Sequence, residues 1–240
     1  SIVNELNSAE TKIITLEDPV EYDLPGVTQI PIHSEDKELF AEKLRAVLRE
    51  DPNIIMIGEI RDLDTAKTAL QASLTGHLVL STFHASSAST AVSRLIDMAG
   101  ENALLASAIK LINAQRLLRR VCEHCKEPVI LDQVTQEKIQ KALTNIPGDL
   151  QNLVTNPTLF KGKGCPACNG LGYRGRIPII EQLVMNKQLE ELLGSSQQIT
   201  ADQIEAAAVS DGMITLLQDA LIKVLSGATT LEEVEHVLDF

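Results

Sequence analysis

Two apolar stretches of the sequence end in carboxylates that could serve phosphate chemistry. Residues 11–17 (TKIITLE) lead into Glu17 and Asp18, and residues 54–57 (IIMI) lead into Glu59. A carboxylate at the end of a buried strand can position a water molecule or coordinate Mg²⁺ beside a phosphate. Acids are also common in solvated turns, so the stretch at Glu17 and Asp18 alone is more typical of an ordinary turn. The stretch at Glu59 alone fits a buried strand with an ordinary acidic exit equally well.

A third candidate segment, residues 75–84 (TGHLVLSTFH), has histidines on both sides of an apolar stretch. His77 and His84 are seven positions apart, so we expect them at opposite ends of one strand and not in a shared metal site. Thr82 and His84 could hydrogen-bond to a terminal phosphate. A single histidine is more often a structural residue, so this segment indicates function only in combination with the two stretches that end in carboxylates.

The cysteines form a separate constellation. Cys122 and Cys125 make one Cys-x-x-Cys pair, and Cys165 and Cys168 make another after 39 intervening residues. Two such pairs suit a tetrahedral zinc ion with four thiolate ligands, which leaves no open position for catalysis. Two disulfides or four free thiols are the alternatives, and His124 is interpreted as a bystander. We expect structural zinc at this site.

The elements that must position these residues follow from the hydrophobic pattern. Strands are predicted over 11–17, 27–32, 54–57 and 77–83. The second is expected at a sheet edge because of Pro31, and the other three are expected to be buried. Helices are predicted over 36–50, 64–74 with Asp64 as the N-cap, 87–99 and 103–120. Alternating strands and helices indicate a parallel α/β sheet, in which ligands bind outside the carboxyl ends of the strands. Five side chains should therefore converge on one edge: Glu17, Asp18, Glu59, Thr82 and His84.

The alternation of predicted strands and helices ends after residue 120. Residues 121–175 contain both cysteine pairs around a polar helical segment, and residues 176–184 read as a short strand. The remainder, 186–240, is predicted to be helical, with Thr200 and Thr229 as caps. We therefore divide the chain into regions 1–120, 121–175 and 176–240.

Composition excludes several classes of protein. The chain has 240 residues, a net charge of −12 and only 2% aromatic residues, which opposes binding of nucleic acid through basic surface or stacked bases. No apolar run approaches the roughly 18 residues that a membrane span needs, so membrane insertion is not expected. Residues 1–6 read as the inside of a helix that began upstream, so we expect the chain to be a fragment.

In their order and spacing, the three polar segments resemble the motifs of the secretion ATPase family of type II secretion and type IV pilus assembly. Residues 17–21 (EDPVE) match the family's Asp box, 57–62 (IGEIRD) its Walker B segment and 75–84 its His box. The similarity continues through 115–117 (QRL) into the cysteine region. It implies an incomplete RecA-like sheet, a tetracysteine zinc subdomain that docks partners, and a helical C-terminal tail.

The resemblance also implies roles for individual residues. Glu17 would act as the general base or water-positioning carboxylate, and Glu59 would support Mg²⁺ and the γ-phosphate of ATP. The residues implied in nucleotide binding and its coupling to subunit movement are Asp18, Arg61, His77, Thr82 and His84. Arg61, together with Arg45 and Arg49, is a further candidate for phosphate or inter-subunit contacts, although a helix-surface cation is the more common role for each.

For the whole protein, the resemblance implies a cytoplasmic hexamer, peripheral to the inner membrane, that hydrolyses ATP and works on an inner-membrane platform. A departure from the family is the absence of Gly-x-x-x-x-Gly-Lys-Ser/Thr, the loop that cradles the phosphates. In the family this loop lies shortly before the Asp-box strand, so we expect the chain to begin just past it. The chain alone is therefore predicted to lack ATPase activity. The alternative is a non-hydrolysing docking module.

Overall fold

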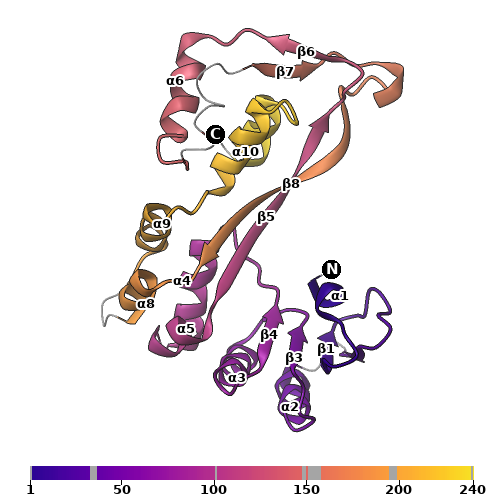
Figure 1. The fold of residues 1–240 in the computed structure, drawn as a ribbon, viewed down its shortest axis with the longest axis vertical. Helices are drawn as coiled ribbons and strands as arrows, with labels where there is room; N and C mark the ends of the chain where they lie inside the picture. Colours follow the sequence, from indigo (N-terminus) through magenta and orange to yellow (C-terminus); the bar gives the residue numbers. More distant parts are fainter. Residues whose placement is uncertain are drawn as a thin grey trace. The chain divides into compact units, whose positions relative to one another are not determined.

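The computed structural model describes residues 2–32, 37–100, 102–147, 150, 158–194, 199–238 and 240, without the side chains of 37–39 and 102–104. The chain forms two compact units (Figure 1). Unit 1 comprises Ser1–Ala85, Thr90–Lys110 and Met185–Ala201. Unit 2 comprises Ser86–Ser89, Leu111–Val184 and Asp202–Phe240. No helix among the described residues is both long and apolar enough to cross a membrane.

A parallel sheet of four strands forms the centre of unit 1. Its strands are β1 (Ile13–Glu17), β2 (Thr28–Pro31), β3 (Ile54–Ile57) and β4 (Leu78–Ser81), in the order β2-β1-β3-β4. The register pairs Leu16 with Ile57 and Ile57 with Ser81, so β1, β3 and β4 end at the same level. The predicted parallel α/β sheet is confirmed, as is the edge position of β2.

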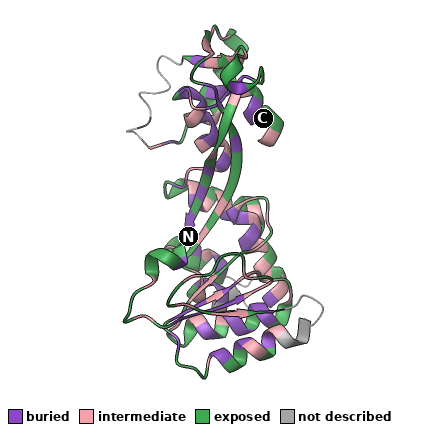
Figure 2. Ribbon diagram, turned by 90° about the vertical axis from the view of Figure 1, so that its right-hand side faces the viewer, coloured by how far each residue is buried: buried purple, intermediate pink, exposed green. Residues whose placement is uncertain are grey.

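Two helices cover one face of this sheet, and Val3 of a third packs on the other face. Unit 1 contains α1 (Ile2–Leu6), α2 (Lys37–Val47), α3 (Leu63–Leu74), α5 (Asn102–Ala108), α8 (Lys187–Gly194) and α4 (Ala88–Ala99) except for the first two residues of α4. On one face, buried residues of α2 and α3 pack against the strands, and these buried positions are purple in Figure 2. That core consists of Ile14, Leu16, Ile32, Leu44, Val47, Ile55, Ile57, Ala69 and Ala72. Each fully buried Leu or Ile stabilises the fold by about 1.5–3 kcal/mol.

Two sequence predictions in unit 1 were wrong in detail. Asp62, not Asp64, caps α3, because its Oδ1 accepts a hydrogen bond of 2.8 Å from the Thr65 amide and its Oδ2 one from the Thr65 hydroxyl. The strand predicted as buried, β4, lies at an edge of the described sheet and is partly exposed, with Leu78 at 46% exposure. Its apolar composition is typical of an interior strand.

Unit 2 is organised around a long antiparallel ribbon of β5 (Leu111–Val121) and β8 (Tyr173–Val184). A second antiparallel pair, β6 (Lys126–Val129) and β7 (Leu159–Gly162), lies beyond one end of the ribbon. The α-helices are α6 (Gln133–Ala142), α9 (Ala201–Ser210) except for Ala201, α10 (Leu216–Leu225) and α11 (Leu231–Leu238), and a short 3-10 helix spans Pro166–Cys168. The core joins the ribbon to α6, α10 and α11 through residues such as Leu118, Ile179, Leu221 and Val234.

The predicted helix over 103–120 was the largest error. The chain is helical only to Ala108 and becomes strand β5 at Leu111. Pairing with β8 fixes this segment as a strand, since Leu111 lies opposite Val184 and Leu118 opposite Ile177. The partner strand is distant in sequence, so the local spacing of leucines could not reveal it. The paired strands also cross two predicted region boundaries, at residues 120 and 175.

A cap in the C-terminal helices was also misplaced by one residue. The Thr230 hydroxyl, not that of Thr229, accepts a hydrogen bond of 3.2 Å from the Glu233 amide in the first turn of α11. Thr229 instead donates its hydroxyl to the carbonyl of Arg119 in β5 at 2.8 Å. Both threonines thus fasten the start of α11 within unit 2.

Glu181 of β8 is a buried carboxyl group that binds the first residues of two helices. Its Oε1 accepts the Ala88 amide of α4 at 2.7 Å, and its Oε2 accepts the Leu216 amide of α10 at 3.1 Å. The residue is only 2% exposed. The first-turn amides of a helix have no partner within the helix, so this single side chain satisfies one in each.

We expect Glu181→Ala to lower the free energy of unfolding by about 2–5 kcal/mol, because it leaves two buried amides unpaired. The matched control is Glu235→Ala, at an exposed position of α11, which should change it by less than about 0.5 kcal/mol. Urea denaturation followed by circular dichroism measures both. Equal stability of the two variants would contradict the role of Glu181.

Candidate functional site

Close polar contacts between side chains connect the carboxyl ends of three neighbouring strands in unit 1. Arg61 Nε lies 2.6 Å from Glu59 Oε2, and Arg61 Nη1 lies 3.3 Å from Asp18 Oδ2. His84 Nε2 lies 2.9 Å from the other carboxyl oxygen of Glu59, Oε1. The sheet register accounts for this convergence, since β1, β3 and β4 end side by side. We call Asp18, Glu59, Arg61 and His84 the edge cluster.

The charges of the edge cluster are arranged to keep Arg61 cationic. The hydrogen bond from Arg61 to Glu59, and then the negative charge of Glu59, raise the pKa of Arg61 above its ordinary value, with Asp18 adding to this. The carboxylates are mostly covered, with side-chain exposures of 19% for Glu59 and 24% for Asp18, while the His84 side chain is 90% exposed. An exposed imidazole and guanidinium beside two carboxylates can bind both a phosphate and a cation.

Thr82 joins this edge through the backbone. Its hydroxyl donates to the carbonyl of Gly58 at 2.6 Å, and its own carbonyl accepts the amide of Ile60 at 3.1 Å. A Cβ at Gly58 would come within 3.1 Å of the Leu16 carbonyl oxygen, so the close approach of β1 and β3 favours glycine here. The single hydroxyl proton of Thr82 is therefore engaged, and its oxygen remains able to accept.

Glu17 lies next to Asp18 but turns to different partners. Its Oε1 accepts hydrogen bonds from the Thr15 hydroxyl at 2.6 Å and from the Gln29 amide at 2.9 Å. The sequence prediction located the carboxylate but missed both of its hydrogen-bond partners. Thr15 lies on the same strand as Glu17, and Gln29 lies on the neighbouring strand β2. Their parallel register, Thr15 opposite Gln29, could have been found only once β1 and β2 were paired.

His77 is separate from the edge cluster. It precedes β4, and its Nδ1 lies 3.0 Å from the Ala72 carbonyl and 3.2 Å from the Thr75 hydroxyl at the end of α3. This agrees with the expected placement of the two histidines at opposite ends of one strand. Arg45 and Arg49 are exposed on α2 and just after it. Their roles, like that of His77, stay predictions.

Arg94 is a residue that sequence reasoning missed. It lies in α4 and donates from Nη1 to the carbonyl of His84, and its guanidinium lies 5.2 Å from the centre of the Phe83 ring. Arg94 thereby holds the backbone that carries the His84 imidazole. A single arginine in a helix gives no sequence signal for such a contact.

The cysteines converge in unit 2. Their four Sγ atoms all lie within 4.8 Å of one another, with Cys165 and Cys168 at 3.7 Å and the cross pairs Cys122–Cys165 and Cys125–Cys168 at 3.9 Å. Four thiolates at Zn–S distances of about 2.3 Å around a tetrahedral ion lie about 3.8 Å apart, so the donor set fits zinc. All four are free thiols in the structure, which opposes the two-disulfide alternative.

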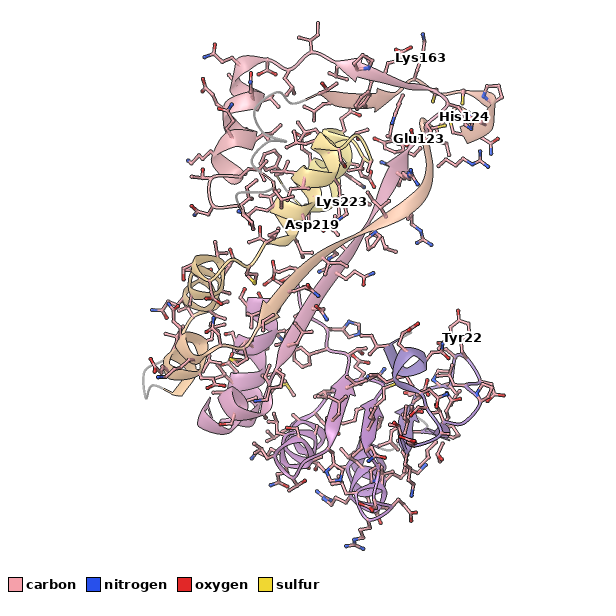
Figure 3. All side chains as sticks on the ribbon, in the orientation of Figure 1. Tyr22, Glu123, His124, Lys163, Asp219 and Lys223 are labelled. Carbon is pink, nitrogen blue, oxygen red and sulfur yellow. The ribbon has the colours of Figure 1, made fainter. Side chains whose placement is uncertain are left out.

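Backbone donors around these thiols favour a thiolate at one of them. Burial alone would raise the pKa of Cys168, but amide donation from Cys165 and Gly172, both at 3.2 Å, lowers that pKa to about 6. Burial raises the pKa of Cys125 to about 12. His124 is exposed, and Figure 3 shows it with Glu123 and Lys163 at the end of the ribbon that carries the cysteines.

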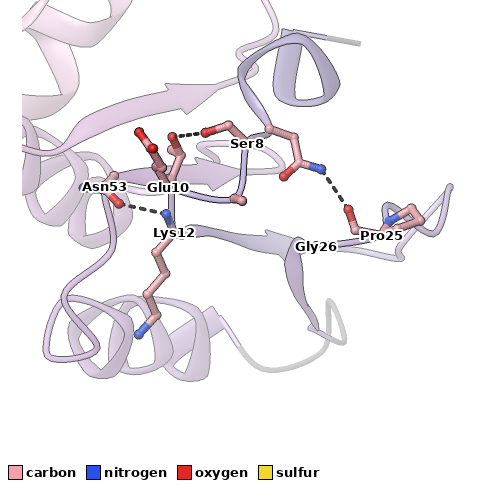
Figure 4. Close-up of a pocket in the computed structure, with 9 residues that line it drawn as sticks. Ser8, Glu10, Lys12, Pro25, Gly26 and Asn53 are labelled. Carbon is pink, nitrogen blue, oxygen red and sulfur yellow. Dashed lines mark hydrogen bonds between the residues drawn. The ribbon is translucent and has the colours of Figure 1, made fainter.

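A surface cavity of about 650 Å³ lies elsewhere, at the amino-terminal edge of the unit 1 sheet (Figure 4). Its polar lining is bonded to protein, since Asn53 Oδ1 accepts the Lys12 amide and Asn7 Nδ2 donates to the Pro25 carbonyl, both at 2.8 Å. None of the predicted site residues lines it. The chemistry-bearing side chains are at the opposite ends of the strands.

Comparison with known proteins identifies the family of this chain. The profile of the family described as type II/IV secretion system protein matches residues 1–236. The chain belongs to this family. Among curated relatives, type II secretion system ATPase E of Vibrio cholerae is 44% identical over 237 residues, which cover 98% of this chain and 44% of that protein. Type IV pilus assembly ATPase PilB of Thermus thermophilus is 42% identical over 234 residues, covering 98% of this chain and 25% of that protein.

Solved structures show the same fold. The pilus retraction motor PilT, crystallised with bound ADP, superposes with a TM-score of 0.66 at 25% identity, over 99% of this chain and 55% of that one. The ATPase DotB of Legionella pneumophila superposes with a TM-score of 0.64 at 20% identity, over 100% of this chain and 55% of that one. The chain thus spans less than half the length of the curated relatives described above.

Proposed function

We propose that this member of the type II/IV secretion family is part of a motor that hydrolyses ATP to power pseudopilus or pilus assembly and protein secretion. The observation that supports the proposal most is the edge cluster, in which Asp18, Glu59, Arg61 and His84 meet at the carboxyl ends of neighbouring parallel strands. Ligands of open α/β sheets bind at this edge. The named activities of the relatives, secretion ATPase and pilus assembly ATPase, support the same conclusion.

In this proposal, each residue of the site has a positioning or electrostatic role. Glu17 accepts a proton from the attacking water, and Arg61 and His84 face the negative charge that spreads over the γ-phosphoryl oxygens. Asp18 and Glu59 are the carboxylates that would hold Mg²⁺, which when bound neutralises charge on the phosphates. Thr82 fixes the loop after β3 through Gly58 and Ile60.

The open edge of β4 suggests where a phosphate-binding loop would enter. Within the described residues, β4 pairs only with β3, although its sequence LVLS is that of an interior strand. A further parallel strand beside β4, followed by a Gly-x-x-x-x-Gly-Lys-Ser/Thr loop, would cover Leu78 and end next to Thr82 and His84. That loop would supply backbone N–H donors and a lysine to the same edge.

The two segments that carry the cysteines, residues 111–129 and 159–176, support a docking role within the same protein, and we call them the cysteine module. They contain eight Lys or Arg and two acids in a chain of net charge −12. We therefore infer that this part of the chain, rich in Lys and Arg, contacts an inner-membrane platform protein, with the motor a cytoplasmic hexamer peripheral to that membrane. The zinc ion would hold the module's shape, and the non-hydrolysing docking module is the alternative function.

We expect the full-length protein to turn over ATP and the 240-residue chain alone to show no turnover. Losing the phosphate loop removes several charge-assisted hydrogen bonds worth about 1.5–3 kcal/mol each, which weakens ATP binding by at least about 10³-fold. Phosphate release and titration with a fluorescent ATP analogue measure both forms. Stoichiometric hydrolysis by the 240-residue chain would refute its inactivity. A full-length protein that binds the platform without turnover would favour the docking module.

A further inference from the structure

The two carboxyl oxygens of Glu17 are in different surroundings. Oε1 accepts two hydrogen bonds, from Thr15 Oγ1 at 2.6 Å and from Gln29 Nε2 at 2.9 Å. Among the described residues, Oε2 accepts none. A carboxylate with one oxygen engaged cannot rotate freely, and the donors draw negative charge onto the engaged oxygen. The oxygen that remains free is then the one available to take a proton.

Thr15 is well placed to hold this orientation. It lies two residues before Glu17 on β1, so both side chains are on the same face of the strand. Thr15 is fully buried, at 0% exposure, and its hydroxyl donates to Glu17. A buried polar group on a strand otherwise made of Ile13, Ile14 and Leu16 is unusual, because an apolar residue would pack there without needing a partner.

Gln29 provides the second contact and connects it to the loop after β1. Its Nε2 donates to Glu17 Oε1 and to the Tyr22 carbonyl, while its Oε1 accepts the Leu24 amide at 2.7 Å. The amide is thus bonded on both its nitrogen and its oxygen, which fixes its orientation. Because β2 pairs with β1 in parallel register, Gln29 stands opposite Thr15, and the two donors reach the same carboxyl oxygen from neighbouring strands.

We propose that Thr15 and Gln29 are positioning residues for ATP hydrolysis, which fix Glu17 through Oε1 and leave Oε2 to receive the proton of the attacking water. This inference rests on the proposed ATPase function. The water oxygen bonds to the γ-phosphorus, the bond from that phosphorus to the ADP oxygen breaks, and the water proton passes to Oε2. The proton then leaves to solvent, so ATP and water yield ADP and phosphate. General-base catalysis requires this alignment of acceptor and water.

The test uses two pairs of variants in the full-length protein. Thr15→Val removes the hydroxyl with little change in shape, while Thr15→Ser keeps it. Gln29→Met removes all three hydrogen bonds of the side-chain amide at similar size, while Thr28→Ala alters the exposed neighbour on β2. We expect Thr15→Val and Gln29→Met each to lower kcat by about 10-fold or more, with KM for ATP within about 2-fold, because the lost bonds are to a charged group. Thr15→Ser and Thr28→Ala should keep wild-type kcat.

A double-mutant cycle separates positioning of Glu17 from a general structural effect. Adding Thr15→Val or Gln29→Met to Glu17→Gln should produce no further loss, because the residues act through the same carboxylate. Losses that multiply, or wild-type kcat in Thr15→Val and Gln29→Met, would overturn the inference while leaving the ATPase proposal intact. Full turnover by Glu17→Gln would instead overturn the role of Glu17 itself. If Thr15→Val does not fold, as judged by thermal melting, Gln29→Met decides the question.

Discussion

Replacing Glu17 with glutamine in the full-length protein is expected to lower ATP turnover by about 10³-fold and to leave nucleotide affinity nearly unchanged. Such a loss corresponds to about 4 kcal/mol of transition-state stabilisation. Glutamine keeps the length of the side chain and an oxygen that can accept from Thr15 and Gln29. It cannot take a proton from water, so the chemical step fails while the surrounding geometry survives.

The matched control is Glu42→Gln, which makes the same chemical change at an exposed position of α2 in unit 1. Its kcat and KM should equal those of the wild type. Steady-state phosphate release gives both constants, and titration with a fluorescent ATP analogue gives the affinity. Near-normal turnover by Glu17→Gln would assign proton acceptance to another group, and a parallel loss of affinity would indicate a role in binding instead of chemistry.

The convergence of Asp18, Glu59 and His84 on one edge of the sheet could be predicted, because parallel strands place their carboxyl ends together. Glu59 and Asp18 are far apart in sequence, yet both contact Arg61 because β1 and β3 share a register. The partners of these groups could not be predicted. Arg94 contacts the His84 backbone from α4, and Gln29 reaches Glu17 from the neighbouring strand. Such contacts depend on side-chain direction, which residue spacing alone does not specify.

The ribbon of unit 2 shows a different limit of sequence reasoning. Local spacing predicted a helix up to residue 120, but the strand state of β5 depends on pairing with β8, from Leu111–Val184 to Val121–Tyr173. The cysteine pairs, by contrast, could be joined without knowing the strands between them. The expectation that four sulfurs share one zinc ion places two distant segments side by side, whatever the chain between them does.

Removal of the metal is expected to unfold the cysteine module while unit 1 stays folded. The full-length protein should bind about one zinc ion per chain, and Cys165→Ser/Cys168→Ser should bind almost none, because two of four ligands are lost. Apparent binding free energies of structural zinc in small peptides are about 10–16 kcal/mol, and this binding energy is also folding energy. The short pair β6–β7 has little core of its own to replace it.

Two backbone hydrogen bonds near the cysteines identify the amides whose hydrogen exchange should change when the metal is removed. The amide of Cys122 donates to the Gly172 carbonyl at 2.9 Å, and the amide of Lys163 donates to the Cys125 carbonyl at 3.1 Å. Hydrogen exchange at both should accelerate on metal removal, whereas the β1–β3 amides of unit 1 should keep their protection. His124→Ala is the matched control, since His124 is exposed and its removal should leave the zinc content unchanged.

The same measurements distinguish zinc from the remaining alternatives. The ribbon continues from the cysteines into a contact network, in which Arg119 pairs with Glu233 at 2.5 Å and the Tyr173 hydroxyl lies 2.7 Å from Thr230 Oγ1. If zinc holds the cysteines together, loss of amide protection should spread from Gly172 through Tyr173 to the start of α11. Wild-type protein that contains less than half an equivalent of zinc after reconstitution, or protection that is indifferent to chelator, would refute the structural zinc site and leave four free thiols as the interpretation.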